Sequence, residues 1–439
     1  MDLVKDDVKK LFLKYFFPTV GAALVTSIYI LFDTIFIGQG VGGDGLAALN
    51  IVLPIYSLVF GVGYLIGVGG STVLGIERGR GHNDKAIDIF SLSVYISIAS
   101  AALFLVVGKF FMDDIALMLG ATDITISLIE EYMKIVALGF VPFTIGSTLQ
   151  GFVRIDKNPK LAMIATITGG LINIILDYIF VFPLNMGMYG AGLATVLSYT
   201  ISMGILLTHF LSKKNTLRLN YRCFRYKYLS RIISNGIPSF FIEMSTGVII
   251  YLFNFQLLKF IGETGVTAYS IISNTAIIFI SISNGICQTI QPIVSVNIGA
   301  KKYKRSMEFR KIAFYVAIIF GLTATILGFL FPEELIKVFV TPTEEIKQIA
   351  VVAIRMYFTA FIIMGANMVL AGYFQAIEMP KVAIIISSLR GLIVVGILIF
   401  VLPCFLGVSG IWLSVPITEL ITFIVAIYIS NRTFKEKYV

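Results

Sequence analysis

Long, continuous apolar segments alternate with short polar ones along almost the whole chain. Each apolar segment holds about 20 residues or more, the length that an α-helix needs to cross the hydrocarbon core of a bilayer. Hydrophobicity does not alternate residue by residue within them, as it would in the strands of a transmembrane β-barrel. We therefore predict an all-α membrane protein with twelve transmembrane helices. The expected spans are roughly 11–37, 46–74, 86–111, 124–152, 159–182, 189–212, 231–258, 266–296, 309–331, 347–375, 380–403 and 409–430.

Composition excludes a soluble protein and charge placement orients the chain. Hydrophobic residues make up 57% of the 439 residues and charged residues only 13%. Lys and Arg outside the spans gather on the side of the N-terminus, as in the loop that we expect to carry Arg154, Lys157 and Lys160. The positive-inside rule then places both termini in the cytoplasm. We expect a multi-pass protein of the cell (plasma) membrane. The net charge of +9 is therefore an orientation signal, not a nucleic-acid-binding patch.

The two halves of the chain carry glycines and prolines at matching positions, at a fixed offset of 220 residues. The matching pairs are Pro18 and Pro238, Gly45 and Gly265, Gly79 and Gly299, Pro183 and Pro403, and Gly190 and Gly410. We predict two homologous units, 1–219 (the N-lobe) and 220–439 (the C-lobe), with six spans each. Because six is even, both units cross the membrane in the same sense, which gives a parallel pseudo-two-fold repeat around a central cleft.

The ionisable residues inside the spans are the strongest functional signal. A carboxylate at mid-membrane costs about 2.5–3.5 kcal/mol on insertion scales and usually marks an ion or substrate pathway. Asp33 in the first span and Asp177 in the fifth have Phe253 and Ile397 as their repeat counterparts, so the N-lobe alone carries these two acids.

Asn173 lies one helical turn before Asp177 on the same helix face, and Thr195 in the sixth span is expected at similar depth. Two carboxylates, an amide and a hydroxyl form an all-oxygen set suited to a hard cation such as Na⁺. Two neighbouring carboxyl groups can instead hold a proton. The alternative without a ligand is a satisfied buried hydrogen-bond network, which the cost of two intramembrane acids disfavours.

Glu243, Arg390 and Glu419 are intramembrane charges of the C-lobe only. They either form one stabilising salt-bridged cluster or line the cleft and meet a cationic substrate, and the cleft interpretation is favoured for Glu243. His82 and His209 are expected on the solvent side, and neither has a partner that would suggest a site.

The sequence offers no chemistry for an enzyme. It contains no G-x-x-x-x-G-K-[ST] motif to bind ATP phosphates, no His/Cys/Glu metal set and no Ser/His/Asp candidate for a membrane hydrolase. We therefore expect neither enzymatic activity nor a cofactor other than a coupling ion.

Several of these segments resemble the MATE (multidrug and toxic compound extrusion) family. They are FDTIFIGQG followed by LAALN in the first two spans, LINIILDYIFVFP and GAGLATVLSY in the fifth and sixth, and QTIQPIVSVNIGAKKY in the eighth, which is similar to the bacterial multidrug exporter branch.

The resemblance implies cation-coordinating roles for Asp33, Asn173, Asp177 and Thr195, with the Ala191 carbonyl as a further ligand. It also implies that the first helix bends at Pro18. The expected function is a secondary antiporter, acting as a monomer, that exports lipophilic organic cations in exchange for inward Na⁺ or H⁺. The alternatives are a lipid-linked oligosaccharide flippase of the same superfamily, which would need a cationic cleft, and a membrane enzyme.

Overall fold

The computed structural model describes residues 2–213, 215–221, 223–337 and 343–437, of which 434–437 are described by their backbone only. All regular structure in these residues is helical. The helices in chain order are α1 (Val8–Gly40), α2 (Gly43–Gly79), α3 (Asn83–Phe110), α4 (Met112–Met118), α5 (Asp123–Ile155), α6 (Pro159–Val181), α7 (Gly187–Leu211), α8 (Tyr226–Phe260), α9 (Glu263–Gly299), α10 (Tyr303–Leu330), α11 (Pro332–Lys337), α12 (Glu344–Tyr357), η1 (Phe358–Ala360), α13 (Phe361–Ala376), α14 (Pro380–Ser388), η2 (Leu389–Ile393), α15 (Val394–Leu406) and α16 (Val408–Lys437).

Twelve helical segments of the described chain are long and apolar enough to cross a membrane, which confirms the predicted number of spans. The tenth span combines α12 and α13 across the 3₁₀ turn η1, and the eleventh combines α14 and α15 across the π-helical turn η2. α4 and α11 are short helices between spans. Backbone groups in hydrocarbon have no water to bond, so these apolar runs satisfy them within each helix.

The two halves repeat their backbone geometry as well as their sequence. Gly42 and Gly262, 220 residues apart, immediately precede α2 and α9 and have φ of 96° and 77°, a region that favours glycine. Lys157 and Glu378 both have positive φ, 64° and 60°, although neither is glycine. Each precedes by two residues a proline that begins a helix, α6 and α14. The same turns therefore recur in both halves.

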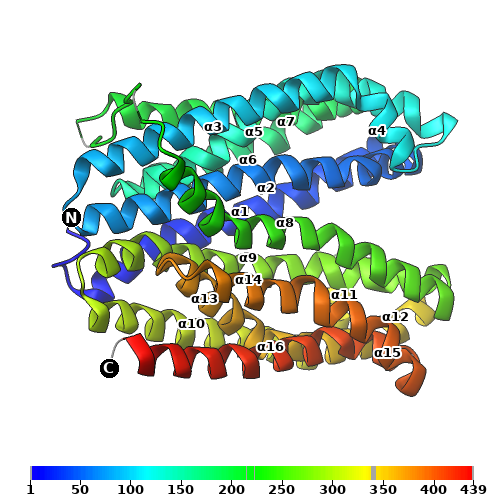
Figure 1. Cartoon of the computed structure of the whole chain (residues 1–439). Helices are drawn as coiled ribbons and strands as arrows, with labels where there is room; N and C mark the ends of the chain where they lie inside the picture. The colour runs from blue at the N-terminus through cyan, green and yellow to red at the C-terminus, as the bar shows by residue number, and fades with distance from the viewer. Residues whose placement is uncertain (1, 214, 222, 338–342, 438–439) are drawn as a thin grey trace.

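The helices lie roughly alongside one another in two bundles, with α1 to α7 in one and α8 to α16 in the other (Figure 1). α1 begins and α16 ends at the same end of the molecule, which we name the terminal face, and we name the opposite end the far face (Figure 1). α1 and α2 pack against α8 and α9 across the boundary between the bundles. The point at which one repeat ends, expected between residues 219 and 220, stays a prediction.

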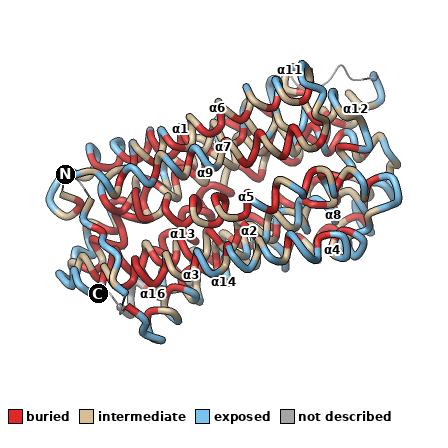
Figure 2. The backbone as a smooth tube through the Cα atoms, turned by 90° about the horizontal axis from the view of Figure 1, so that it is seen from above, coloured by how far each residue is buried: buried red, intermediate tan, exposed pale blue. Residues whose placement is uncertain are grey.

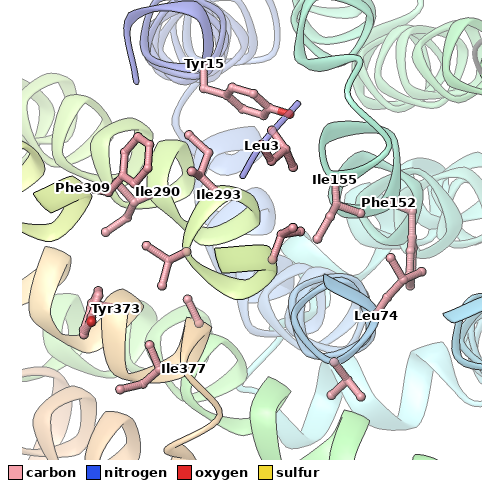
Figure 3. Packing of buried hydrophobic residues seen from close by; sticks show 14 of the residues in the cluster. Leu3, Tyr15, Leu74, Phe152, Ile155, Ile290, Ile293, Phe309, Tyr373 and Ile377 are labelled. Carbon is pink, nitrogen blue, oxygen red and sulfur yellow. The ribbon is translucent and has the colours of Figure 1, made fainter. Parts of the chain in front are cut away.

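Buried residues run along the faces where helices meet, and exposed ones cover the outer faces and the ends (Figure 2). One buried apolar cluster contains residues of both bundles near the terminal face, including Tyr15, Phe152, Ile290 and Tyr373 (Figure 3). Toward the far face the core divides into one cluster in each bundle, around Phe140 and around Phe361. The lobes are thus joined at the terminal face and packed separately at the far face.

Close backbone approach and ion pairs hold the terminal face shut. A Cβ on Gly79 would lie 2.1 Å from the Val296 carbonyl oxygen, so the two lobes touch there only because residue 79 is glycine. Arg231 of α8 pairs with Glu77 of α2 at 2.8 Å and with Glu378 at 2.5 Å. Arg231 therefore bridges the two lobes.

Candidate cation site and central chamber

One face of α1 lies along α6 and carries Asp33. Val25, Tyr29, Asp33 and Ile37 are spaced four residues apart and so share this face. Val25 and Tyr29 approach Gly170 of α6, where an added Cβ would lie 2.9 Å from each. The absence of a side chain at residue 170 lets α1 come close, and this brings Asp33 beside Asp177.

Asn173 and Asp177 occupy the buried face of α6, with 2% and 0% of their surfaces exposed. Asp33 is half-buried, and its side chain and those of Asn173 and Asp177 adjoin one another. The structure thus brings together the three N-lobe residues that the sequence had grouped.

Four oxygens of this group accept no hydrogen bond within the described chain: Asp33 Oδ1, Asn173 Oδ1 and both carboxylate oxygens of Asp177. A buried polar atom without a partner typically costs about 1–3 kcal/mol, and more when it is charged. Adjacent carboxyl groups need a cation or a proton between them to avoid repulsion. The residues present fit a hard cation such as Na⁺, which prefers oxygen ligands.

Thr195 and Ala191 lie on the buried face of α7, which packs on α6. The Thr195 hydroxyl donates a 3.1 Å hydrogen bond to the Ala191 carbonyl, which leaves the hydroxyl oxygen available as an acceptor. The Ala191 carbonyl and the Thr195 hydroxyl therefore lie side by side on the face of α7 that packs on α6.

Tyrosine hydroxyls that the sequence did not single out surround the group. Tyr132 lies beside Thr195 and within electrostatic range of both acids, and its hydroxyl is 2.8 Å from that of Tyr56. The Tyr29 and Tyr199 hydroxyls are 2.6 Å apart. In the sequence, a tyrosine within an apolar span cannot be told from an ordinary core residue. Only its neighbours in the tertiary structure identify it as part of the site.

Two connected cavities lie on the terminal side of this site, between the lobes. The N-lobe cavity, about 150 Å³, has walls that include Tyr29, Tyr199, Gln150 and Arg154. The C-lobe cavity, about 130 Å³, has walls that include Glu243, Gln291, Gln375 and Arg390. Tyr64, Asn284 and Gln288 line both cavities, so we describe them together as the central chamber.

The three predicted C-lobe charges do not form one cluster. Arg390 pairs with Glu419 through Nε and Nη2, each 3.0 Å from Oε1, and Asn367 donates to the other carboxylate oxygen at 2.7 Å. Glu243 has no hydrogen bond or ion pair with either residue and faces the C-lobe cavity. The structure therefore separates an ion pair, Arg390 with Glu419, from a solitary acid in the chamber.

Two predictions about basic residues were wrong. Arg154 lies inside α5 and lines the N-lobe cavity, because the helix continues to Ile155. His209 is fully buried, with Nε2 2.8 Å from Asp156 Oδ2. His82 is exposed as expected, but its Nδ1 lies 2.9 Å from Glu77.

Pro18 lies within α1, which is one helix from Val8 to Gly40. The neighbouring Thr19 hydroxyl is 2.5 Å from that of Thr289 on α9, and Ser27 donates to Ser281. Every hydrogen bond found between the lobes of the described chain lies between the terminal face and this Ser27 contact. Asp33 lies further toward the far face.

Comparisons with known proteins agree with this geometry. The MatE family model matches residues 18–179 and again residues 237–402. The multidrug export protein MepA of Staphylococcus aureus (strain MSSA476) is 26% identical over 431 residues, covering 97% of this chain and 94% of that protein.

Two solved structures share the fold. One is described as the outward-facing conformation of a multidrug resistance MATE family transporter, with a TM-score of 0.93, 21% identity, and coverage of 99% of this chain and 97% of that one. The other is a MOP superfamily transporter from Pyrococcus furiosus whose binding pocket is described as reversed in polarity, with a TM-score of 0.91, 21% identity and the same coverage.

Proposed function

This chain belongs to the MatE family of membrane transporters, and from that premise we propose that it is a secondary antiporter. It exports lipophilic organic cations in exchange for inward Na⁺ or H⁺. The multidrug export activity named for its staphylococcal relative supports this substrate class. We further propose that both termini are cytoplasmic in the plasma membrane, so that the far face is extracellular. The site and the chamber lie within one chain and need no second subunit, so we also propose that the protein acts as a monomer.

The observation that carries the proposal is the set of unpartnered oxygens on Asp33, Asn173 and Asp177. A structural network would pair its oxygens with donors, as Glu419 does with Asn367 and Arg390. Oxygens that are buried and left without donors suit an exchangeable cation, with Thr195 as a fourth ligand and Ala191 as an optional fifth.

Coupling follows from the position of α1. Its Asp33 face contacts α6, while Thr19 and Ser27 contact α9 of the other lobe. A cation entering from the far face binds between the two acids and relieves their repulsion. It shifts the equilibrium between conformers because its affinity for each conformer differs. Pro18 supplies the bend, since it leaves the Lys14 carbonyl without its helical donor.

The test uses the full chain in proteoliposomes, with efflux of a fluorescent organic cation followed under an imposed Na⁺ gradient and, separately, a pH gradient. Asp33→Asn is expected to abolish gradient-driven efflux while leaving the amount of inserted protein unchanged. Asp114→Asn, which removes an exposed acid of α4, is the matched control and should transport normally. Unchanged efflux in Asp33→Asn would falsify the proposal, and the gradient that drives the wild type identifies the coupling ion.

The flippase alternative receives no support from the chamber. A pyrophosphate-linked substrate needs concentrated positive charge. The charged residues lining the two cavities are Arg154 and Glu243, of opposite sign, together with Arg390, which Glu419 already neutralises.

A further inference from the structure

We propose that the central chamber binds substrates through two opposite charges, with Arg154 taking a carboxylate and Glu243 taking the cationic group. The chamber would then accept zwitterionic amphiphiles as well as simple cations. This inference rests on the proposed export function and adds to it a substrate class and a binding residue.

Arg154 is a permanent cation without an acidic partner. An arginine guanidinium keeps its proton in proteins. In the described chain Arg154 donates to the neutral amide oxygens of Gln288 and, at 3.0 Å, Gln150, and it forms no ion pair. Gln150 is held in turn by a 3.1 Å hydrogen bond to Thr166. These amides fix the orientation of the guanidinium and leave its charge uncompensated at the cavity wall.

Glu243 is the matching uncompensated charge on the other side of the chamber. It lines the C-lobe cavity and forms no hydrogen bond or ion pair among the residues that the structure covers. Tyr64 lines both cavities and lies within electrostatic range of both Glu243 and Arg154. A single bound molecule reaching past Tyr64 can therefore contact both charges.

The internal repeat shows that this polarity is not a property of the fold. Glu243 corresponds to Ala23 at offset 220, and Arg154 corresponds to Gln375 at offset 221. Ala23 lines the N-lobe cavity and Gln375 the C-lobe cavity, so each counterpart occupies the equivalent wall but is neutral. The N-lobe thus carries a positive charge, Arg154, and the C-lobe a negative charge, Glu243, each at a position where the other lobe is neutral.

In a chamber that binds cations alone, Arg154 would be unfavourable to binding, because an unpaired positive charge repels them. A carboxylate offers the planar, bidentate partner that a guanidinium favours. A zwitterion satisfies both charges at once, and it leaves neither of them buried without a partner when the chamber closes.

The experiment compares two dyes that differ only at the carboxyl group. Rhodamine 110 carries a delocalised cation and a carboxylate, and rhodamine 123 is its methyl ester and carries only the cation. Dissociation constants are measured by fluorescence polarisation with the purified full chain. We expect Arg154→Gln to weaken rhodamine 110 binding about ten-fold. It should also strengthen rhodamine 123 binding, since the repulsion is removed.

Two further variants complete the design. Arg154→Lys keeps the charge and loses the planar fork, so it should weaken rhodamine 110 about three-fold. This variant decides the question if Arg154→Gln does not yield monodisperse protein. Glu243→Gln should weaken both dyes, because both carry the cation.

The outcomes separate this inference from the antiporter proposal. If the Arg154 variants change both dissociation constants by the same factor, or change neither, the arginine has only a structural role and the carboxylate site is wrong. Gradient-driven transport of rhodamine 123 by the wild type is measured in parallel. If the wild type does not transport rhodamine 123 under either gradient, the antiporter proposal is wrong, whatever the ratio of the two dissociation constants.

Discussion

Asp177 and Glu419 are both almost completely buried acids in transmembrane helices, yet their surroundings differ in kind. Glu419 receives hydrogen bonds from Asn367 and Arg390 on both carboxylate oxygens. Asp177 receives none on either oxygen. The first arrangement stabilises the fold, and the second leaves coordination capacity for a ligand.

Removing the charge of Glu419 should therefore destabilise the protein. Glu419→Gln leaves Arg390 without its counter-charge, and breaking a buried pair in this way costs on the order of 3 kcal/mol. We expect a clearly lower apparent melting temperature in detergent. Glu333→Gln, which breaks an exposed pair with Lys347, should leave the melting temperature unchanged. Equal melting temperatures for the two variants would contradict this distinction.

Removing the Thr195 hydroxyl should weaken Na⁺ binding if Na⁺ is the coupling ion. Bound Na⁺ stabilises the folded protein by mass action, so the rise of the melting temperature with Na⁺ concentration reports affinity. Thr195→Ala is expected to shift that dependence to about ten-fold higher Na⁺, because one ligand is lost. Thr195→Ser should retain most of the affinity, and Thr208→Ala, an exposed hydroxyl on the same helix, should retain all of it. A normal Na⁺ dependence in Thr195→Ala would remove Thr195 from the ligand set.

At the scale of elements, α1 and α2 connect the candidate site to the boundary between the lobes. α1 carries Asp33 on one face and the Thr19 and Ser27 contacts on another. α2 meets the other lobe through Gly79, where the Val296 carbonyl leaves no room for a Cβ. In the proposed antiport cycle, these contacts would have to rearrange for the terminal face to open.

A methyl group at residue 79 should therefore force the terminal face open. Gly79→Ala places a Cβ 2.1 Å from the Val296 carbonyl, which the lobes can relieve only by separating. We expect Cys287, which lines the C-lobe cavity, to react several-fold faster with an impermeant thiol reagent applied to inside-out vesicles. The other two cysteines, Cys223 and Cys404, are replaced by serine for this measurement.

Gly43→Ala is the control for this measurement, because an added Cβ there meets nothing within 4 Å. It should label at the wild-type rate. Unaltered labelling in Gly79→Ala would show that the glycine contact does not hold the terminal face shut.

At the scale of the whole molecule, a cluster of hydrogen bonds to Asp156 attaches Thr216, in the connection between α7 and α8, to the N-lobe. Asp156 accepts hydrogen bonds from Arg78 at 2.9 Å, from His209 and from the backbone and hydroxyl of Thr216. Burial alone would raise the pKa of Asp156, but the hydrogen bond with His209, the Arg78 charge and the Thr216 contacts outweigh it and hold the pKa at about 2.

Because the pKa of Asp156 is shifted, the stability of the folded protein depends on pH. The pKa of Asp156 is lower in the folded state than the value of about 3.9 for an unfolded chain. Its stabilisation, on the order of 2–3 kcal/mol, is complete above pH 4 and disappears as pH falls toward 2. Asp156→Asn should therefore lower the melting temperature at neutral pH, with a difference from wild type that shrinks between about pH 4 and pH 2.

Asp84→Asn, which removes an exposed acid near the same face, should match the wild type throughout. A pH-independent difference between Asp156→Asn and wild type would mean that the Asp156 charge does not contribute.

Much of the architecture is readable from the sequence because it depends on local or linear properties. Helix length follows from the length of an apolar run, and the repeat follows from prolines and glycines at matching positions, such as Pro18 and Pro238. The grouping of Asp33 with Asp177 followed from their absence in the other half. Lys134 and Arg355 align at offset 221 near the far ends of their spans. Both are exposed, and long basic side chains at such positions can extend to the membrane interface.

The sequence by itself thus determined the twelve spans, revealed the repeat and predicted the residues of the candidate cation site. Only the tertiary structure decided that Arg390 pairs with Glu419 while Glu243 faces the chamber alone. It also decided that Arg154 points into a cavity and that His209 is buried against Asp156. The reason is physical. Whether a buried charge finds a partner depends on how each helix is rotated about its axis and on which distant helix it meets, and neither is encoded in a single run of residues.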